Sequence, residues 1–185
     1  AFSGYSPEAH RWAMERNLAL VSGTDCHKPL FLMTDYTNGA LRPVTLIFAR
    51  ERSLDGVREA LDARRTAVFA DGMVYGREEV LQPLMKALFE VSDVKFSEKK
   101  MTFRIVNRSS IPLVLRKAAG SENVVFPRDM IIRPFEETTL TIYGWDYKKP
   151  MNLDRFDVNF QVLNFFVDAG KPMTYSLHFE KPAKR

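Results

Sequence analysis

Long hydrophobic runs are absent from this sequence of 185 residues. A helix that crosses a bilayer needs about 18–20 consecutive apolar residues, and no segment reaches that length. The sequence has one cysteine, Cys26, which excludes an internal disulfide and leaves the cellular compartment unassigned. It begins at Ala1 rather than at Met, with no basic-then-apolar leader. Because residues 1–20 have helix and strand patterns, we expect a trimmed beginning and a missing part that was folded.

The sequence also lacks a dense cluster of basic residues. It has 27 Lys and Arg against 23 Asp and Glu, a formal net charge of +4. Residues 91–185 carry the excess, with 16 basic against 11 acidic side chains, whereas residues 1–90 carry 11 against 12. These charges are scattered and are not grouped with aromatic rings, as a single-strand nucleic-acid groove requires. We interpret them as a solvated surface, which argues against nucleic acid as a partner.

Helix and strand patterns alternate in the first half of the chain. Ser6-Pro7-Glu8 is typical of a helix start, and Ser53 precedes a second run with helical spacing. A third helix is predicted from about Arg77 to Phe89. Three apolar runs without regular polar alternation predict strands buried on both faces, at residues 18–21, 44–49 and 66–70. This order predicts βα units with a mainly parallel sheet, and three strands cannot close such a sheet.

Near Val91 the period of the apolar residues changes from about 3.6 to 2. About eight short strands, separated by turn residues, predict an antiparallel β-sandwich of immunoglobulin-like type in residues 91–185. The predicted fold class is therefore α/β plus all-β, with an α/β part in residues 1–90. Asn107-Arg108-Ser109 matches a glycosylation acceptor but is equally typical of a hairpin turn, which we predict.

The sharpest local motif is Asp25-Cys26-His27, which directly follows the apolar run at 18–21. Parallel α/β folds place their sites at this end of a strand. The spacing lets a carboxylate and an imidazole converge on one divalent metal ion. Taken alone, the motif is explained more simply by loop side chains that are hydrogen-bonded to the backbone. Cys26 has no second histidine or base nearby and is interpreted as a small, half-buried residue.

The motif lies within a longer similarity. A helix start at Ser6 and a strand leading into Asp25 and His27 precede the runs at residues 44–54, 60–67 and 76–79. Over about residues 5–90 the sequence resembles the late part of the polymerase-and-histidinol-phosphatase (PHP) family of metal-dependent phosphoesterases. The resemblance implies the C-terminal fragment of a (β/α) PHP barrel followed by the immunoglobulin-like sandwich.

The resemblance also implies a site and a reaction. The family holds two or three divalent ions (Zn, Mn or Fe) at one face of the barrel, and Asp25 and His27 match its late Asp-x-His ligands. By resemblance, these ions bind a phosphate mono- or diester and activate a water for in-line attack. Arg77, at a predicted helix start, is the arginine that we expect to contact the phosphate.

Most of the family's ligands have no counterpart here. The N-terminal His-x-His and the mid-domain His, Glu and Asp ligands are absent, and the one upstream histidine, His10, lies in a predicted helix. His178 falls on the outer face of the last predicted strand. Because a complete site needs about three to four protein ligands per ion, we expect the chain to be inactive as a phosphoesterase on its own.

Two non-enzymatic alternatives stay open. In one, the sandwich is an accessory module that binds a protein, a glycan or a surface, and exposed aromatic residues such as Trp145 and Tyr147 would favour it. In the other, the sandwich only shields the barrel. Because an incomplete apolar sheet must be covered, we expect the sandwich or a second copy of the chain to cover it. The sequence leaves the location open, and a secreted or periplasmic protein would fit it.

Overall fold

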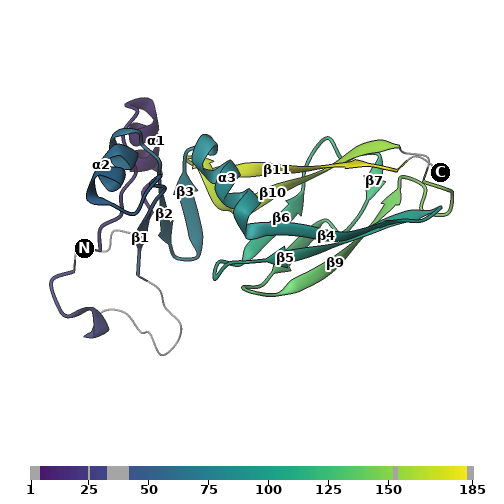
Figure 1. Cartoon of the computed structure of the whole chain (residues 1–185), viewed down its shortest axis with the longest axis horizontal. Helices are drawn as coiled ribbons and strands as arrows, with labels where there is room; N and C mark the ends of the chain where they lie inside the picture. The colour runs from purple at the N-terminus through teal and green to yellow at the C-terminus, as the bar shows by residue number, and fades with distance from the viewer. Residues whose placement is uncertain (1–4, 25, 33–41, 152–153, 183–185) are drawn as a thin grey trace. The chain divides into compact units, whose positions relative to one another are not determined.

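The chain folds into two units (Figure 1). A computed structural model describes residues 5–24, 26–32, 42–151 and 154–182. The first unit comprises Ala1–Leu81 and Asn164–Pro172, and the second comprises Gln82–Leu163 and Met173–Arg185. The polypeptide passes between the units in helix α3 (Glu78–Leu88), in strand β10 (Arg155–Asp168) and near the start of β11.

Both α-helices wholly within the first unit begin where the sequence predicts. Helix α1 (Pro7–Glu15) follows Ser6, and α2 (Leu54–Asp62) follows Ser53. The hydroxyl oxygen of each serine accepts a hydrogen bond from the backbone N–H three residues on, at 3.2 and 2.9 Å respectively. Each cap satisfies an amide that has no partner inside the helix, which explains why these helices start at a serine.

The strands of the first unit do not form the mainly parallel sheet that the sequence predicted. They are β1 (Val44–Ile47), β2 (Thr66–Ala70), β3 (Met73–Gly76) and the end of β10, in that order. The pairs β1–β2 and β2–β3 are antiparallel, and only β3 and β10 pair in parallel. The expectation of parallel βα units is therefore wrong for β1 to β3.

The turn between β2 and β3 explains part of this difference. Asp71 and Gly72 both have positive φ, 52° and 76°, the combination required by a type I′ hairpin. A two-residue turn can join only antiparallel strands, because a parallel pair needs a long crossover. The Asp-Gly dipeptide is a recognised sequence signal for such a hairpin, although the β2–β3 hairpin was not predicted from it.

The apolar run at residues 18–21 is not a strand, and this prediction is also wrong. Across the described ranges no strand pairs with it, and the side chains of Leu18 and Val21 are exposed. A strand is defined by a ladder of hydrogen bonds with a neighbour, so apolar β-forming residues alone do not make one. In the loop that follows, Leu30–Leu32 form a short 3₁₀ helix, η1.

The second unit is a two-sheet antiparallel sandwich, as predicted (Figure 1). One sheet has the order β4-β5-β9-β7, with bounds Phe89–Phe96, Lys100–Asn107, Glu137–Gly144 and Val124–Val125. The other contains β8 (Asp129–Ile132), β6 (Leu113–Lys117), the first part of β10, and β11 (Lys171–Glu180), which pairs with β10. The pairs with a recorded register in this unit are all antiparallel.

Side chains that alternate along the strands fill the space between the two sheets. In β5 buried and partly exposed residues alternate, and Phe103 and Ile105 are fully buried. The ring centroids of Phe103 on β5 and Phe179 on β11 lie 4.9 Å apart. This contact joins the inner faces of the two sheets. Burial of one such ring contributes about 1.5–3 kcal/mol, so the period-2 pattern supplies the core.

Asn107, at the end of β5, joins three carbonyl groups inside the second unit. Its side chain is fully buried, and the amide nitrogen donates to the carbonyl oxygens of Ile111, Ile132 and Arg133 at 2.8–3.2 Å. Its side-chain oxygen accepts from the backbone N–H of Ser109 at 3.0 Å. The segment is not the predicted hairpin turn, because β5 and β6 lie in different sheets and do not pair; Asn107 instead makes a local side-chain turn to Ser109. The buried amide cannot carry a glycan in this fold.

We predict that Asn107→Ala lowers the free energy of unfolding of the chain by about 2–3 kcal/mol, because buried carbonyl groups would lose their donor. Urea denaturation measures this change. Asn123→Ala is the matched control: its side chain is exposed and its backbone oxygen supplies the recorded contact, so stability should hardly change. Equal stability of the two variants would contradict the role given to Asn107.

Candidate functional site

The segment that carries the predicted metal ligands starts where helix α1 ends. Asn17 follows the C-cap with a φ of 55°, and the backbone N–H of Leu18 donates to the carbonyl oxygen of Ala13 at 2.8 Å. Asparagine tolerates this left-handed conformation better than most residues, because its short polar side chain can hydrogen-bond locally. The helix therefore stops at this point, and the chain turns into residues 18–24.

Two arginines from later in the chain hold this turn. Arg77 Nη2 donates to the carbonyl oxygens of Ala13 and Leu18, at 3.4 and 3.1 Å. Arg64 Nε donates to the carbonyl oxygen of Asn17 at 2.7 Å. Cations at a helix C-terminus satisfy carbonyls that have no intrahelical partner and favour the helix dipole. The structure thus gives Arg77 a positioning role, and its contact with a substrate stays a prediction.

Residue Ser22 ties the segment to strand β1. Its backbone N–H donates to Thr45 Oγ1 at 2.9 Å, and the two hydroxyl oxygens lie 3.1 Å apart. The side-chain bonds replace a backbone ladder at this edge of β1. Beyond them, the half-buried Cys26 donates its S–H to the carbonyl oxygen of Lys28 at 2.7 Å.

Only one of the two predicted metal ligands can be placed. His27 has an exposed side chain, and Asp25 lies outside the described residues. In the ranges that the structure describes, no three His, Cys, Asp or Glu side chains are grouped as a metal site would need. The assignment of Asp25 and His27 as metal ligands therefore stays a prediction.

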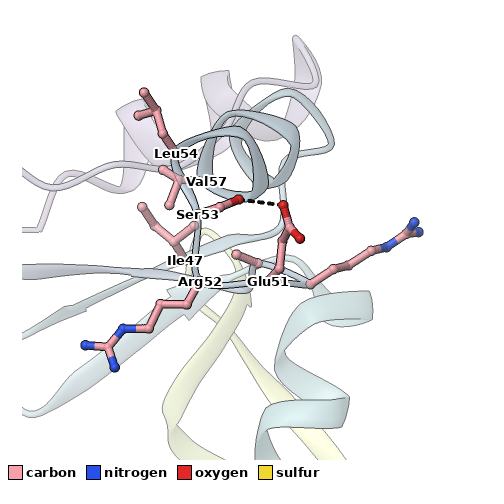
Figure 2. Close-up of a pocket in the computed structure, with 8 residues that line it drawn as sticks. Ile47, Glu51, Arg52, Ser53, Leu54 and Val57 are labelled. Atoms are coloured by element: carbon pink, nitrogen blue, oxygen red, sulfur yellow. Dashed lines mark hydrogen bonds between the residues drawn. The ribbon is translucent and has the colours of Figure 1, made fainter.

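A hollow of about 610 Å³ lies where β1 leads into α2 (Figure 2). Anions favour helix starts, but here Ser53 Oγ donates to Glu51 Oε1 at 2.5 Å, so a carboxylate already lies at this one. In Figure 2 the side chain of Arg52 extends away from the start of α2. The hollow is therefore not arranged to bind a phosphate group.

A second group of polar side chains is buried in the first unit, around His10 of α1. His10 is 3% exposed, and its Nδ1 lies 3.1 Å from the hydroxyl oxygen of Tyr5. The ring of Tyr5 stacks on Tyr75 of β3 at 4.1 Å, and Tyr75 stacks on Phe166 of β10 at 5.5 Å, between centroids. The other ring nitrogen, Nε2, is buried and finds no hydrogen-bond partner in the described part of the chain.

Burial keeps this group neutral. It lowers the pKa of His10, and Arg77 adds to the decrease while Asp168 opposes it. Burial also raises the pKa of Tyr75 to about 12, with smaller contributions from Tyr5 and Asp71. Both effects have the same cause, since removal from water disfavours the charged form of each side chain.

In the sequence His10 is recognisable only as a helical residue, and the other members of this group were not predicted. Tyr5, Tyr75 and Phe166 come from three distant parts of the chain, and no spacing rule relates them. The available sequence signal for this buried group was the position of His10 on the apolar side of a short helix. Within the described ranges, moreover, no helix is both long and apolar enough to cross a membrane.

Comparisons with known proteins give a family match for the C-terminal part and a similar crystal structure. Residues 90–178 match the model of an Ig-like domain family, DUF5001. A crystal structure of a two-domain protein from Bacteroides vulgatus, described as containing a predicted PHP-like metal-dependent phosphoesterase, is 35% identical to the chain with a TM-score of 0.88. The match covers 96% of this chain and 50% of that protein, so the chain spans half of its length. No curated protein matches the chain.

These findings confirm the resemblance predicted from the sequence. The chain is similar to one half of a two-domain PHP-like protein, and its C-terminal part contains an Ig-like domain. Metal dependence is stated for the Bacteroides vulgatus protein, and the metal ligands of this chain stay a prediction.

We predict that His10 makes the first unit sensitive to acid. Its pKa in the folded state lies below the ordinary value of 6.5, so the unfolded state binds more protons as the pH falls through 6.5. The free energy of unfolding should therefore decrease from pH 7.5 to 5.5, and less steeply in His10→Phe. Urea titrations followed by Trp12 fluorescence, in a Trp145→Phe background, report on the first unit.

The control is His178→Ala. His178 lies on β11 with its side chain exposed and bound to Asp157 at 2.6 Å, so its removal should leave the pH dependence of the Trp12 signal unchanged. An identical pH dependence in the parent and His10→Phe proteins would show that the buried imidazole does not control acid stability.

Proposed function

We propose that the chain is the C-terminal part of a two-domain metal-dependent phosphoesterase that hydrolyses phosphate mono- or diesters, and that it is inactive without the rest of the enzyme. The observation that carries this proposal is the match, at 35% identity over 96% of the chain, with half of the Bacteroides vulgatus protein. In this proposal most of residues 1–90 belong to the catalytic barrel, and most of residues 91–185, apart from Asn164–Pro172 of the first unit, form the sandwich domain.

In this enzyme Asp25 and His27 would supply two of the metal ligands, and the others would come from outside the chain. Carboxylate and imidazole ligands together suit Zn, Mn or Fe. Bound divalent ions would neutralise the phosphate and activate a water. The contribution of this chain is positional: the bonds from Ser22 to Thr45 fix the segment directly before the ligands.

Arg77 remains a proposed phosphate contact. Its Nη2 is engaged by the carbonyls of Ala13 and Leu18, and a planar guanidinium has further N–H groups that suit phosphate oxygens. One side chain would then hold both the end of α1 and the substrate. Substitution of Arg77 should accordingly change protein stability as well as the KM for substrate.

A second candidate function is that of an accessory module that binds a protein, a glycan or a surface. The observation that favours it is the loop after β9, where Trp145 and Tyr147 are 76% and 60% exposed. Large aromatic side chains in water are typical of binding surfaces. The Ig-like match over residues 90–178 is compatible with this role and with the enzymatic one.

We also propose that further protein buries the exposed apolar side chains of the first unit. The apolar side chains of Ile47 and Leu54 are exposed on this unit. Covering apolar surface contributes about 25 cal/mol per Å², which favours contact with further protein. The rest of the enzyme, the sandwich or a second copy of the chain would provide it, and light scattering of the isolated chain tests for the second copy.

We predict that the 185-residue chain, supplied with Mn²⁺ or Zn²⁺, hydrolyses p-nitrophenyl phosphate and bis(p-nitrophenyl) phosphate no faster than the metal ion alone. The reason is that most ligands of the family site are missing from the chain. Release of p-nitrophenol measures the rate. Clear hydrolysis that disappears in Asp25→Ala would show instead that the site is complete.

In a full-length protein that includes the upstream half, we predict that His27→Ala lowers both metal content and phosphoesterase rate, by about 10-fold or more. Loss of an outer-shell partner already costs about 10–100-fold, and a direct ligand should cost at least as much. Metal content is measured by inductively coupled plasma mass spectrometry. The control is His178→Ala, which removes an exposed histidine on β11 and should leave both the metal content and the phosphoesterase rate unchanged. Full metal content and full rate in His27→Ala would refute the ligand assignment.

A further inference from the structure

Strand β8 is the last strand of its sheet within the described ranges, so one of its two edges pairs with no described strand. Its other edge pairs with β6, in a register that places Arg116 opposite Asp129 and Val114 opposite Ile131. The strand lies in the second unit and contains none of the proposed metal ligands. An open strand edge is a template on which another strand can pair.

The pairing with β6 shows which backbone groups of β8 point to the open edge. Directly beyond the ladder, the backbone N–H of Lys117 donates to the carbonyl oxygen of Arg128 at 2.7 Å. Hydrogen-bonded and non-hydrogen-bonded pairs alternate along an antiparallel ladder. The backbone groups of Met130 therefore point toward β6, as those of Arg128 do, whereas the N–H and C=O groups of Asp129 and Ile131 point to the open edge.

The exposed side chains of this edge form a pattern that is complementary to itself. Asp129, Ile131 and Arg133 alternate along the chain and are exposed, and the side chain of Ile131 is 65% exposed, whereas the intervening Ile132 is buried. The acidic and the basic residue each lie two positions from Ile131. An antiparallel copy of the same strand, centred on Ile131, therefore sets isoleucine opposite isoleucine and each carboxylate opposite a guanidinium.

We propose that the open edge of β8 binds the β8 strand of a second copy of the chain, antiparallel and centred on Ile131. In this dimer the two Ile131 residues exchange backbone hydrogen bonds, and an Asp129–Arg133 pair lies on either side of them. Apolar pairs and opposite charges that face each other across two strands both stabilise a sheet. The contact is isologous, so it closes as a dimer and does not continue into a fibre.

Both charged side chains are placed to take part. Asp129 Oδ1 accepts a hydrogen bond from Arg116 Nε at 2.6 Å, while its Oδ2 lies 3.9 Å from Arg128 Nε, beyond hydrogen-bond distance. Arg133 is 76% exposed, and its Nη1 lies 3.8 Å from Glu136. A carboxylate can accept from two arginines at once, so the contact with a second copy does not require Asp129 to leave Arg116.

Two prolines limit the length of the interface. Pro127 and Pro134 lie on either side of the edge, and proline has no N–H to donate to a ladder. Because so short a ladder buries less than the 1,200–2,000 Å² or so of a stable complex, we expect a weak dimer, half formed at about 100 μM. The proposal is independent of the phosphoesterase reaction and of the cover proposed for the first unit.

Sedimentation equilibrium of the 185-residue chain, from about 5 to 500 μM, measures this association. Ile131→Lys sets two like charges opposite each other and should raise the dissociation constant about 10-fold or more. Val94→Lys is the matched control. It alters an exposed apolar residue on β4, at the edge of the other sheet, and should leave the dissociation constant unchanged.

An exchange of charges tests the register. Arg133→Glu alone sets carboxylates opposite each other, and Asp129→Lys alone sets cations opposite each other, so each variant should associate about 10-fold more weakly than the unaltered chain. An equimolar mixture of the two variants restores both opposite-charge pairs and should recover the association. Circular dichroism checks that each variant is folded.

Three results would overturn the proposal: a chain that stays monomeric at about 500 μM, a dimer that Ile131→Lys weakens no more than Val94→Lys does, or a mixture that associates no better than its separate variants. The comparison of Ile131→Lys with Val94→Lys decides the question even if a charge variant fails to fold. It also separates this dimer from one that forms through the first unit, which Ile131→Lys would leave intact.

Discussion

Strand β10 runs for 14 residues without interruption, and the first unit depends on the pairing of its last residues with β3. Phe165 lies opposite Val74, and the neighbouring Phe166 stacks on Tyr75. The earlier residues of the same strand pair with β6 in the second unit. Because one strand takes part in both units, neither is a continuous stretch of sequence. Asp168, which affects the pKa of His10, is brought to the first unit by this strand.

The segment before the predicted metal ligands depends on contacts of a similarly long range. Arg64 and Arg77 bind the carbonyls at the end of α1, and Thr45 binds Ser22. The Asp-x-His motif therefore follows a segment whose path is set by side chains 23 to 64 positions away.

The first unit combines two histidine environments with different chemistry. The imidazole of His27 is exposed. That of His10 is buried beside the rings of Tyr5 and Tyr75, and this burial lowers its pKa. In the second unit, the side chains of Trp145 and Tyr147 are exposed. The Ig-like match does not indicate which partner, if any, they bind.

Local chemistry in the sequence determined the helix starts at Ser6 and Ser53, the strand alternation that builds the sandwich, and the resemblance to PHP-like proteins. The helix starts and the strand alternation depend on residues within a few positions of one another, because capping and one-sided burial act at that range. Tertiary structure alone decided the pairing of β1 with β2, the absence of a strand at residues 18–21, and the group around His10. Each of these depends on which distant segment supplies the hydrogen bonds and the covering rings, and no local pattern specifies that choice.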